Sequence, residues 1–165
     1  AAGQAKYMRD QFSYLGVRAP ARKAANKQLF EYLSEQLCGE ALDARVLDGV
    51  VRLCWARPER EMQYFAQELL VHYLVGAEKR RVETSKQFLE DTVMFMVKTK
   101  PWWDTVDYIA SNLVGGLVRH HAQEDVMDKW IKDKHLWVRR SALLHQLRYR
   151  QRTDRDRLLL RHMSI

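Results

Sequence analysis

The sequence contains few of the residues that interrupt or cross-link a chain, with 3 prolines, 7 glycines and 2 cysteines among 165 residues. Because proline and glycine concentrate in turns, their scarcity argues against a turn-rich β fold and favours long helices. Cys38 and Cys54 form no Cys-x-x-Cys or Cys/His cluster, so we expect two reduced core residues of an intracellular protein. A chain of this length can bury a core without disulfides or structural metals.

Long apolar runs and the common cofactor motifs are also missing. No uncharged apolar stretch approaches the roughly 18 residues of a membrane span, and the N-terminal residues show no signal-peptide pattern. Walker, dinucleotide-binding, Gly-x-Ser-x-Gly, helix-turn-helix and zinc-finger motifs are absent. His120-His121 falls in an expected loop without a third ligand at metal spacing. We therefore expect a soluble, cytoplasmic protein that uses no metal or cofactor and reads no DNA sequence.

Apolar residues recur at helical spacing along the chain, and no segment alternates with the period of two that marks a strand. The predicted fold class is therefore all-α. The pattern predicts helices over residues 4–15, 21–37, 42–55, 58–76, 84–98, 101–116, 124–131, 137–150 and 154–165.

Three helix starts resemble one another and recur at roughly 35 to 45 residues: those near Arg60, Asp104 and Arg139. This period in a helical chain favours a right-handed α-solenoid of HEAT or armadillo type with a concave binding groove, against the alternative of a plain helical bundle. We expect one HEAT-like-repeat domain over residues 1–165. The leucines at 158–160 need a partner helix, so we also expect C-terminal repeats beyond Ile165.

The net charge of +7 is unevenly distributed. From Lys129 to Ile165 the chain holds eleven lysines and arginines against three aspartates. A concentration of arginine is the electrostatic footprint of a protein that binds a phosphate backbone, although a solvated basic surface is the simpler alternative.

The most informative stretch follows Pro101, which suits the first turn of a helix. Trp103 and Asp107 stand four residues apart and therefore share one helical face. An indole beside a carboxylate is a poor core element but suits a site that receives a cation. The alternative is that Asp107 forms an ion pair with Arg139 or Arg140 from the next repeat, and the two interpretations are compatible.

Short motifs follow one another along nearly the whole chain. They are Tyr7-Met8-Arg9 leading to Tyr14-Leu15-Gly16, Pro58-Glu59-Arg60-Glu61-x-Gln63, Trp102-Trp103-Asp104-Thr105-Val106-Asp107, Leu136-Trp137-x-Arg139-Arg140, and Gln146-Leu147-x-Tyr149 shortly before Thr153-Asp154. In this order they resemble bacterial DNA alkylation repair enzymes of the AlkD type, which are HEAT-like-repeat DNA glycosylases.

The resemblance implies hydrolytic excision of alkylated purines, such as 3-methyladenine and 7-methylguanine, from duplex DNA without flipping of the lesion, by a monomer associated with the bacterial nucleoid. By motif, Asp107 matches the catalytic carboxylate and Trp103 its aromatic companion. Arg140 matches the groove arginine and Tyr7 an aromatic residue of the same cleft. Further DNA-binding candidates, from the basic final quarter, are Arg139, Arg148 and Arg150.

Two non-enzymatic alternatives remain at this stage. The chain could be a non-catalytic DNA-binding or scaffold protein derived from the same family, or a HEAT-type scaffold that binds proteins. The second alternative fits the fold but not the arginine-rich final quarter, and salt-sensitive DNA binding would separate the two.

Overall fold

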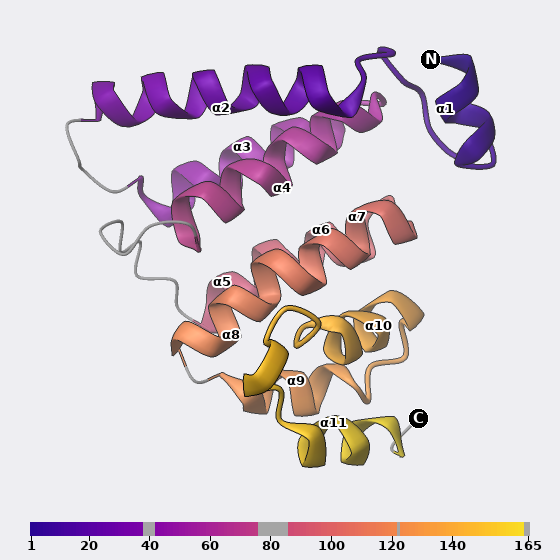
Figure 1. Ribbon diagram of the computed structural model, residues 1–165, viewed down its shortest axis with the longest axis vertical. Helices are drawn as coiled ribbons and strands as arrows, with labels where there is room; N and C mark the ends of the chain where they lie inside the picture. Colours follow the sequence, from indigo (N-terminus) through magenta and orange to yellow (C-terminus); the bar gives the residue numbers. More distant parts are fainter. Residues whose placement is uncertain (38–41, 76–85, 122, 164–165) are drawn as a thin grey trace. The chain divides into compact units, whose positions relative to one another are not determined.

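The computed structural model describes residues 1–37, 42–75, 86–121 and 123–163. Within these ranges the regular structure is helical, and the contact of Ser13 with Glu59 is an isolated bridge, so the all-α class is confirmed. The helices form two compact units, Ala1–Val82 and Glu83–Ile165, which are described in turn (Figure 1). Several positions used in the sequence predictions lie outside the described residues: Cys38, Gly39, Gly76, Thr84 and Ile165.

The first unit contains α1 (Ala2–Tyr7), α2 (Ala19–Gln36), α3 (Ala44–Ala56) and α4 (Arg60–Leu74). Helix α4 packs against both α2 and α3 (Figure 1). In α3, Leu47, Val51 and Trp55 recur every four residues and are almost fully buried, which makes one apolar stripe. Cys54 on the same helix is a buried free thiol, and Asp43 caps the helix by accepting a hydrogen bond from the Arg45 amide.

The prediction of a first helix over residues 4–15 is wrong beyond Tyr7. Residues 9 and 10 both adopt φ of 55°, in the left-handed region, which ends the helix. The amides of Leu15 and Gly16 then donate to the two carboxylate oxygens of Glu61, at 3.1 and 2.9 Å. A contact that is distant in sequence thus satisfies backbone donors that the local pattern assigned to a helix.

Residues around Glu61 that supported the family resemblance pack the first unit together. The Gln63 side chain is buried and donates to the carbonyls of Cys54 and Arg57, at 2.8 and 3.1 Å, which closes the end of α3. The Arg60 guanidinium is fully buried and lies 3.8 Å from the ring centroid of Phe12. This motif therefore positions the start of α4 and the N-terminal segment.

In its described residues, the second unit contains two long helices, each with an inserted π turn, and three shorter helices. Their bounds are α5 (Lys86–Phe88), η1 (Leu89–Val93) and α6 (Met94–Lys98); α7 (Trp103–Tyr108), η2 (Ile109–Val114) and α8 (Gly115–His121); then α9 (Glu124–Trp130), α10 (Leu136–Leu144), the 3₁₀ turn η3 (Arg150–Arg152) and α11 (Arg155–His162). Helix α10 packs against α6, α7, η2 and α9, and thus holds the unit together.

The π turns have a cause in the sequence. Buried residues come in pairs that recur every four residues, at Phe88/Leu89, Thr92/Val93 and Met96/Val97, and at Thr105/Val106, Ile109/Ala110, Leu113/Val114 and Leu117/Val118. An α-helix turns by about 100° per residue, so each step of four rotates the next pair by about 40° away from the core. A π turn holds more residues per turn and takes up this rotation.

Two further helix ends differ from the prediction. The helix expected to stop at 115–116 continues to His121, so His120 and His121 lie in its last turn and not in a loop. The glycine at 115 is buried because the backbone of His145 approaches it closely, which makes it a packing residue instead of a helix stop. The helix expected over 137–150 ends at Leu144, before that close approach.

An ionic cluster around the buried Arg161 side chain fixes α11 to α9. The Arg161 side chain is 3% exposed; its Nη2 donates to Glu124 Oε2 at 2.8 Å and its Nε donates to Asp128 Oδ1 at 2.9 Å. His145 Nε2 lies 3.5 Å from the same Glu124 oxygen. Burial opposes ionisation of Glu124, but the hydrogen bonds from His145 and Arg161 outweigh it and lower its pKa from 4.5 to about 2.

Acidification is expected to weaken the second unit through Glu124. Its pKa is lower in the folded state than in the unfolded chain, so the stabilisation is present above pH 4.5 and is lost as the pH falls toward 2. At about 1.4 kcal/mol per pH unit, this amounts to about 3 kcal/mol. Urea unfolding of the parent and Glu124→Gln should show a stability difference at pH 7 that shrinks toward pH 2.

The matched control is Glu90→Gln, which removes an exposed ion pair with Lys129. Such pairs contribute about 1 kcal/mol or less, so this variant should stay close to the parent at pH 7. A difference between parent and Glu124→Gln that stays constant between pH 7 and pH 2 would contradict the assignment.

Candidate active site

The chain enters α7 through a strained turn. Lys100 has a φ of 51°, in a region that costs a residue other than glycine about 1–2 kcal/mol. Trp102 is extended and forms the N-cap, and its carbonyl accepts hydrogen bonds from the amides of Thr105 and Val106, at 3.3 and 3.0 Å. The helix therefore begins at Trp103, two residues later than the position predicted from the proline.

The two adjacent tryptophans have different surroundings. The Trp102 ring packs against Trp137 at the start of α10, with 6.1 Å between centroids. Trp103 is 37% exposed, and lies one turn before Asp107 on the same helix. Trp102 thus joins two helices, whereas Trp103 presents aromatic surface next to a carboxylate.

Asp107 and Arg140 form a two-pronged ion pair between α7 and α10. Arg140 Nε donates to Asp107 Oδ1 at 2.6 Å, and Nη2 donates to Oδ2 at 2.7 Å. The side chains are 34% and 42% exposed, so solvent reaches both. The hydrogen bonds with Asp107 raise the pKa of Arg140. The carboxylate is therefore fixed in direction and accessible.

Asp107 and Arg140 each keep hydrogen-bonding positions that their ion pair does not use. An ionised carboxylate has about four acceptor positions and a guanidinium has five N–H donors, of which this pair uses two each. Asp107 can thus still accept a hydrogen bond from a water molecule. Arg140 can still donate to an anion.

The neighbouring Arg139 has another function in the structure. Its Nη1 donates to the carbonyls of Asp133 and Lys134, both at 2.9 Å, so it closes the connection between α9 and α10. Arg140 is the one of the two adjacent arginines that meets Asp107. The proposed contact of Arg139 with DNA stays a prediction.

The remaining predicted DNA-binding residues lie elsewhere. Arg148 and Arg150 are exposed on the turn after α10, on either side of Tyr149, which is 9% exposed and donates to the Gly115 carbonyl at 2.8 Å. Burial raises the pKa of Tyr149 to about 12. Tyr7 lies at the end of α1 in the first unit and is 69% exposed.

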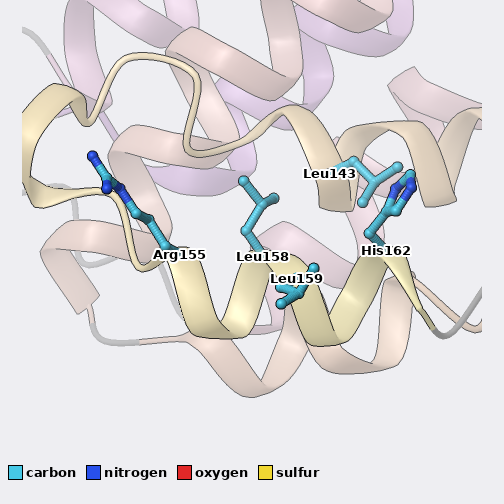
Figure 2. A pocket seen from close by; sticks show the side chains of 5 residues that line it. All are labelled: Leu143, Arg155, Leu158, Leu159 and His162. Atoms are coloured by element: carbon cyan, nitrogen blue, oxygen red, sulfur yellow. The ribbon is translucent and has the colours of Figure 1, made fainter.

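Two hollows open on α10. One, of about 280 Å³, borders the ion pair and is lined by Leu136, Trp137, Arg139, Arg140, Leu143 and Leu144. The other, of about 390 Å³, lies where Leu143 meets Leu158 and Leu159 of α11, with Arg155 and His162 at its two ends (Figure 2). This second hollow has an apolar floor, no carboxylate lines it, and the lining residue that can exchange a proton is His162 at its rim.

The described ranges lack two other kinds of feature. They contain no group of three or more His, Cys, Asp or Glu side chains placed to hold a metal ion. None of their helices is long and apolar enough to cross a membrane. The candidate active site is Asp107 with Arg140 and Trp103, because it combines an accessible carboxylate held in one direction with an exposed indole.

Comparisons with known proteins point in the same direction as the motifs. A family model described as DNA alkylation repair enzyme matches residues 1–161. A solved structure described as "Predicted DNA alkylation repair enzyme from Enterococcus faecalis" is similar at 26% sequence identity and a TM-score of 0.81, over 99% of this chain and 71% of that one. No curated protein matches the sequence significantly.

Proposed function

Because the chain belongs to the family of DNA alkylation repair enzymes, we propose that it is a DNA glycosylase. It would hydrolyse the N-glycosidic bond of cationic alkylated purines, such as 3-methyladenine and 7-methylguanine, in duplex DNA, as the first step of base excision repair. The proposal includes a monomer that works in the bacterial cytoplasm without metal or cofactor. The observation that carries it is the accessible Asp107 carboxylate, held in one direction by Arg140.

Alkylation defines what such an enzyme has to supply. A purine alkylated at N3 or N7 carries a positive charge and leaves as a neutral base, so the enzyme needs no acid to protonate it. The remaining tasks are to stabilise the positive charge that develops on the sugar and to bring a water molecule to C1′. One ionised carboxylate can perform both.

Asp107 is suited to these tasks by its contacts. The fork of Arg140 fixes the carboxylate plane, and acceptor positions remain on Oδ1 and Oδ2 for the attacking water. The Arg140 charge offsets part of the attraction between Asp107 and the sugar cation. Because both side chains are partly exposed, this offset is screened by solvent and the carboxylate retains the larger effect at contact distance.

Trp103 would contribute less than Asp107. A cation above an indole gains about 0.5–2 kcal/mol, depending on how well water is excluded. The 37% exposure of Trp103 places it toward the lower end of that range. We assign Trp103 to support of the cationic sugar or base and Asp107 to the chemical step.

The basic residues would hold the DNA. The free donors of Arg140 can bind a phosphate beside the lesion, and the exposed Arg148 and Arg150 can bind phosphates further along the strand. In the predicted concave groove, Arg139 and Tyr7 would add backbone and aromatic contacts. Each phosphate contact makes binding weaker at higher salt.

The test is release of free base from methylated duplex DNA by the full chain. We expect free 3-methyladenine and 7-methylguanine to appear in the supernatant. We also expect the affinity for DNA to fall steeply between about 50 and 200 mM salt. Unmethylated duplex is the control and should release nothing. Salt-dependent binding without base release would overturn the enzyme and favour the non-catalytic DNA-binding protein. No DNA binding would favour the protein-binding scaffold.

A further inference from the structure

The backbone of Asp107 is held by a second set of contacts, separate from the ion pair. The π turn η2 begins two residues after Asp107. The carbonyls of Asp107 and Tyr108, which directly precede this turn, each accept a hydrogen bond from a side chain inside it. Ser111 Oγ donates to the Asp107 carbonyl at 2.7 Å, and Asn112 Nδ2 donates to the Tyr108 carbonyl at 2.9 Å.

The two side chains are also joined to each other. Asn112 Nδ2 lies 3.1 Å from Ser111 Oγ, so the hydroxyl accepts from Asn112 while it donates to Asp107. Ser111 is 8% exposed, which shields this bond from competition with water. A serine hydroxyl that bonds to the carbonyl four residues earlier alters the local course of a helix. Here this bond lies at the junction between the α-helical and π-helical segments.

We infer that Ser111 is a positioning residue for Asp107. Its hydroxyl fixes the Asp107 carbonyl and therefore the direction in which the side chain leaves the backbone, while Arg140 fixes the carboxylate plane from the other end. The catalytic consequence rests on the proposed glycosylase function. Groups that meet a reacting atom must be held within about 0.5 Å, and a misplacement of about 1 Å costs up to 100-fold in rate.

Ser111→Ala tests this inference in single-turnover base release. We expect the rate to fall about tenfold, with the affinity for methylated duplex within twofold of the parent. Ser111→Thr keeps the hydroxyl, which in a helix can reach the same carbonyl, and should recover most of the rate. The matched control is Ser34→Ala in α2, which removes the same kind of bond, to the Phe30 carbonyl, and should keep the parental rate.

A second measurement does not depend on activity. Arg140 Nε donates a hydrogen bond to Asp107 Oδ1 at 2.6 Å. We therefore expect the Nε proton to be protected from exchange with solvent and to give its own cross-peak in a ¹⁵N correlation spectrum. Asp107→Asn identifies the peak by shifting it. Ser111→Ala should shift or broaden the peak, whereas Ser34→Ala should leave it unchanged.

The two readouts separate the inference from the proposed function. If the parent releases no base, the glycosylase proposal falls, and the Arg140 peak alone decides whether Ser111 positions Asp107. An unchanged rate and an unchanged peak in Ser111→Ala would overturn the inference. A parallel loss of rate, DNA affinity and melting temperature that Ser111→Thr does not recover would overturn it too, because that pattern indicates general structural damage.

Discussion

Replacement of Asp107 by asparagine is expected to slow base release from methylated duplex by at least about 100-fold while DNA affinity changes by less than about threefold. Asparagine has nearly the same shape and can still accept a hydrogen bond from Arg140, but it has no negative charge to offer the sugar cation. Loss of one group that stabilises charge in the transition state typically costs 100- to 1000-fold, or about 2.7–4 kcal/mol.

The stability of this variant should change little. Removal of the charge leaves Arg140 without its ionic partner, but that side chain is 42% exposed and can be solvated. Ion pairs in such positions contribute about 1 kcal/mol or less. A large loss of rate in a protein that melts close to the parent would therefore report on chemistry.

The first unit offers a closely matched control. Asp48 in α3 pairs with Arg52 at 3.2 Å and is 33% exposed, against 34% for Asp107. Asp48→Asn removes an equivalent charge from an ion pair of similar exposure and should retain the parental rate. The rates of the parent, Asp107→Asn and Asp48→Asn are measured by single-turnover release of labelled base. An Asp107→Asn rate within threefold of the parent would show that this carboxylate does not perform the chemistry.

Replacement of Gly115 by alanine is expected to destabilise the second unit by about 3 kcal/mol or more. A Cβ atom at this position would lie 2.1 Å from the carbonyl oxygen of His145, a distance that no real contact reaches. The obstacle is backbone, and His145 is fully buried beside the cluster of Glu124 and Arg161, so it cannot move without disturbing that cluster. The Tyr149 hydrogen bond to the Gly115 carbonyl would be strained as well.

Thermal and urea unfolding measure this prediction, and Gly49→Ala is its control. Gly49 lies within α3 with open space where a Cβ would stand. Alanine has the higher helix propensity, so this change should stabilise the first unit by about 0.5–1 kcal/mol. The same chemical substitution thus has opposite expected signs at the two sites. Gly115→Ala protein that unfolds like the parent would contradict the close approach of α8 and the end of α10.

Local patterns determined most of the helices. The starts of α9 and α11 and, within two residues, the extent of α2 and α3 follow from helical spacing and capping residues, which act within a few residues. Helices α4 and α7 each begin two residues after the proline that predicted them. The residue pairs that repeat every four positions are a signal in the sequence for the π turns η1 and η2. Helical periodicity alone does not distinguish these segments from a plain α-helix. The stacking of these helices into a right-handed solenoid stays a prediction.

The errors occurred where a distant residue competes with the local pattern. The Glu61 carboxylate takes the amides of Leu15 and Gly16, so the first helix ends early. Gly115 was predicted to end a helix, but it lies inside one. A glycine stands there because the His145 backbone occupies the space that a side chain would need. Neither contact has any signature in the residues next to it.

In the candidate site, too, local spacing determined some features and tertiary packing determined the others. The sequence by itself determined that Trp103 and Asp107 share one face of a helix, because a spacing of four residues is a local property. It left open whether Arg139 or Arg140 meets Asp107. Adjacent residues on a helix point about 100° apart, so only the packing of α10 against α7 and η2 could direct Arg140 to the carboxylate and Arg139 to the connection after α9.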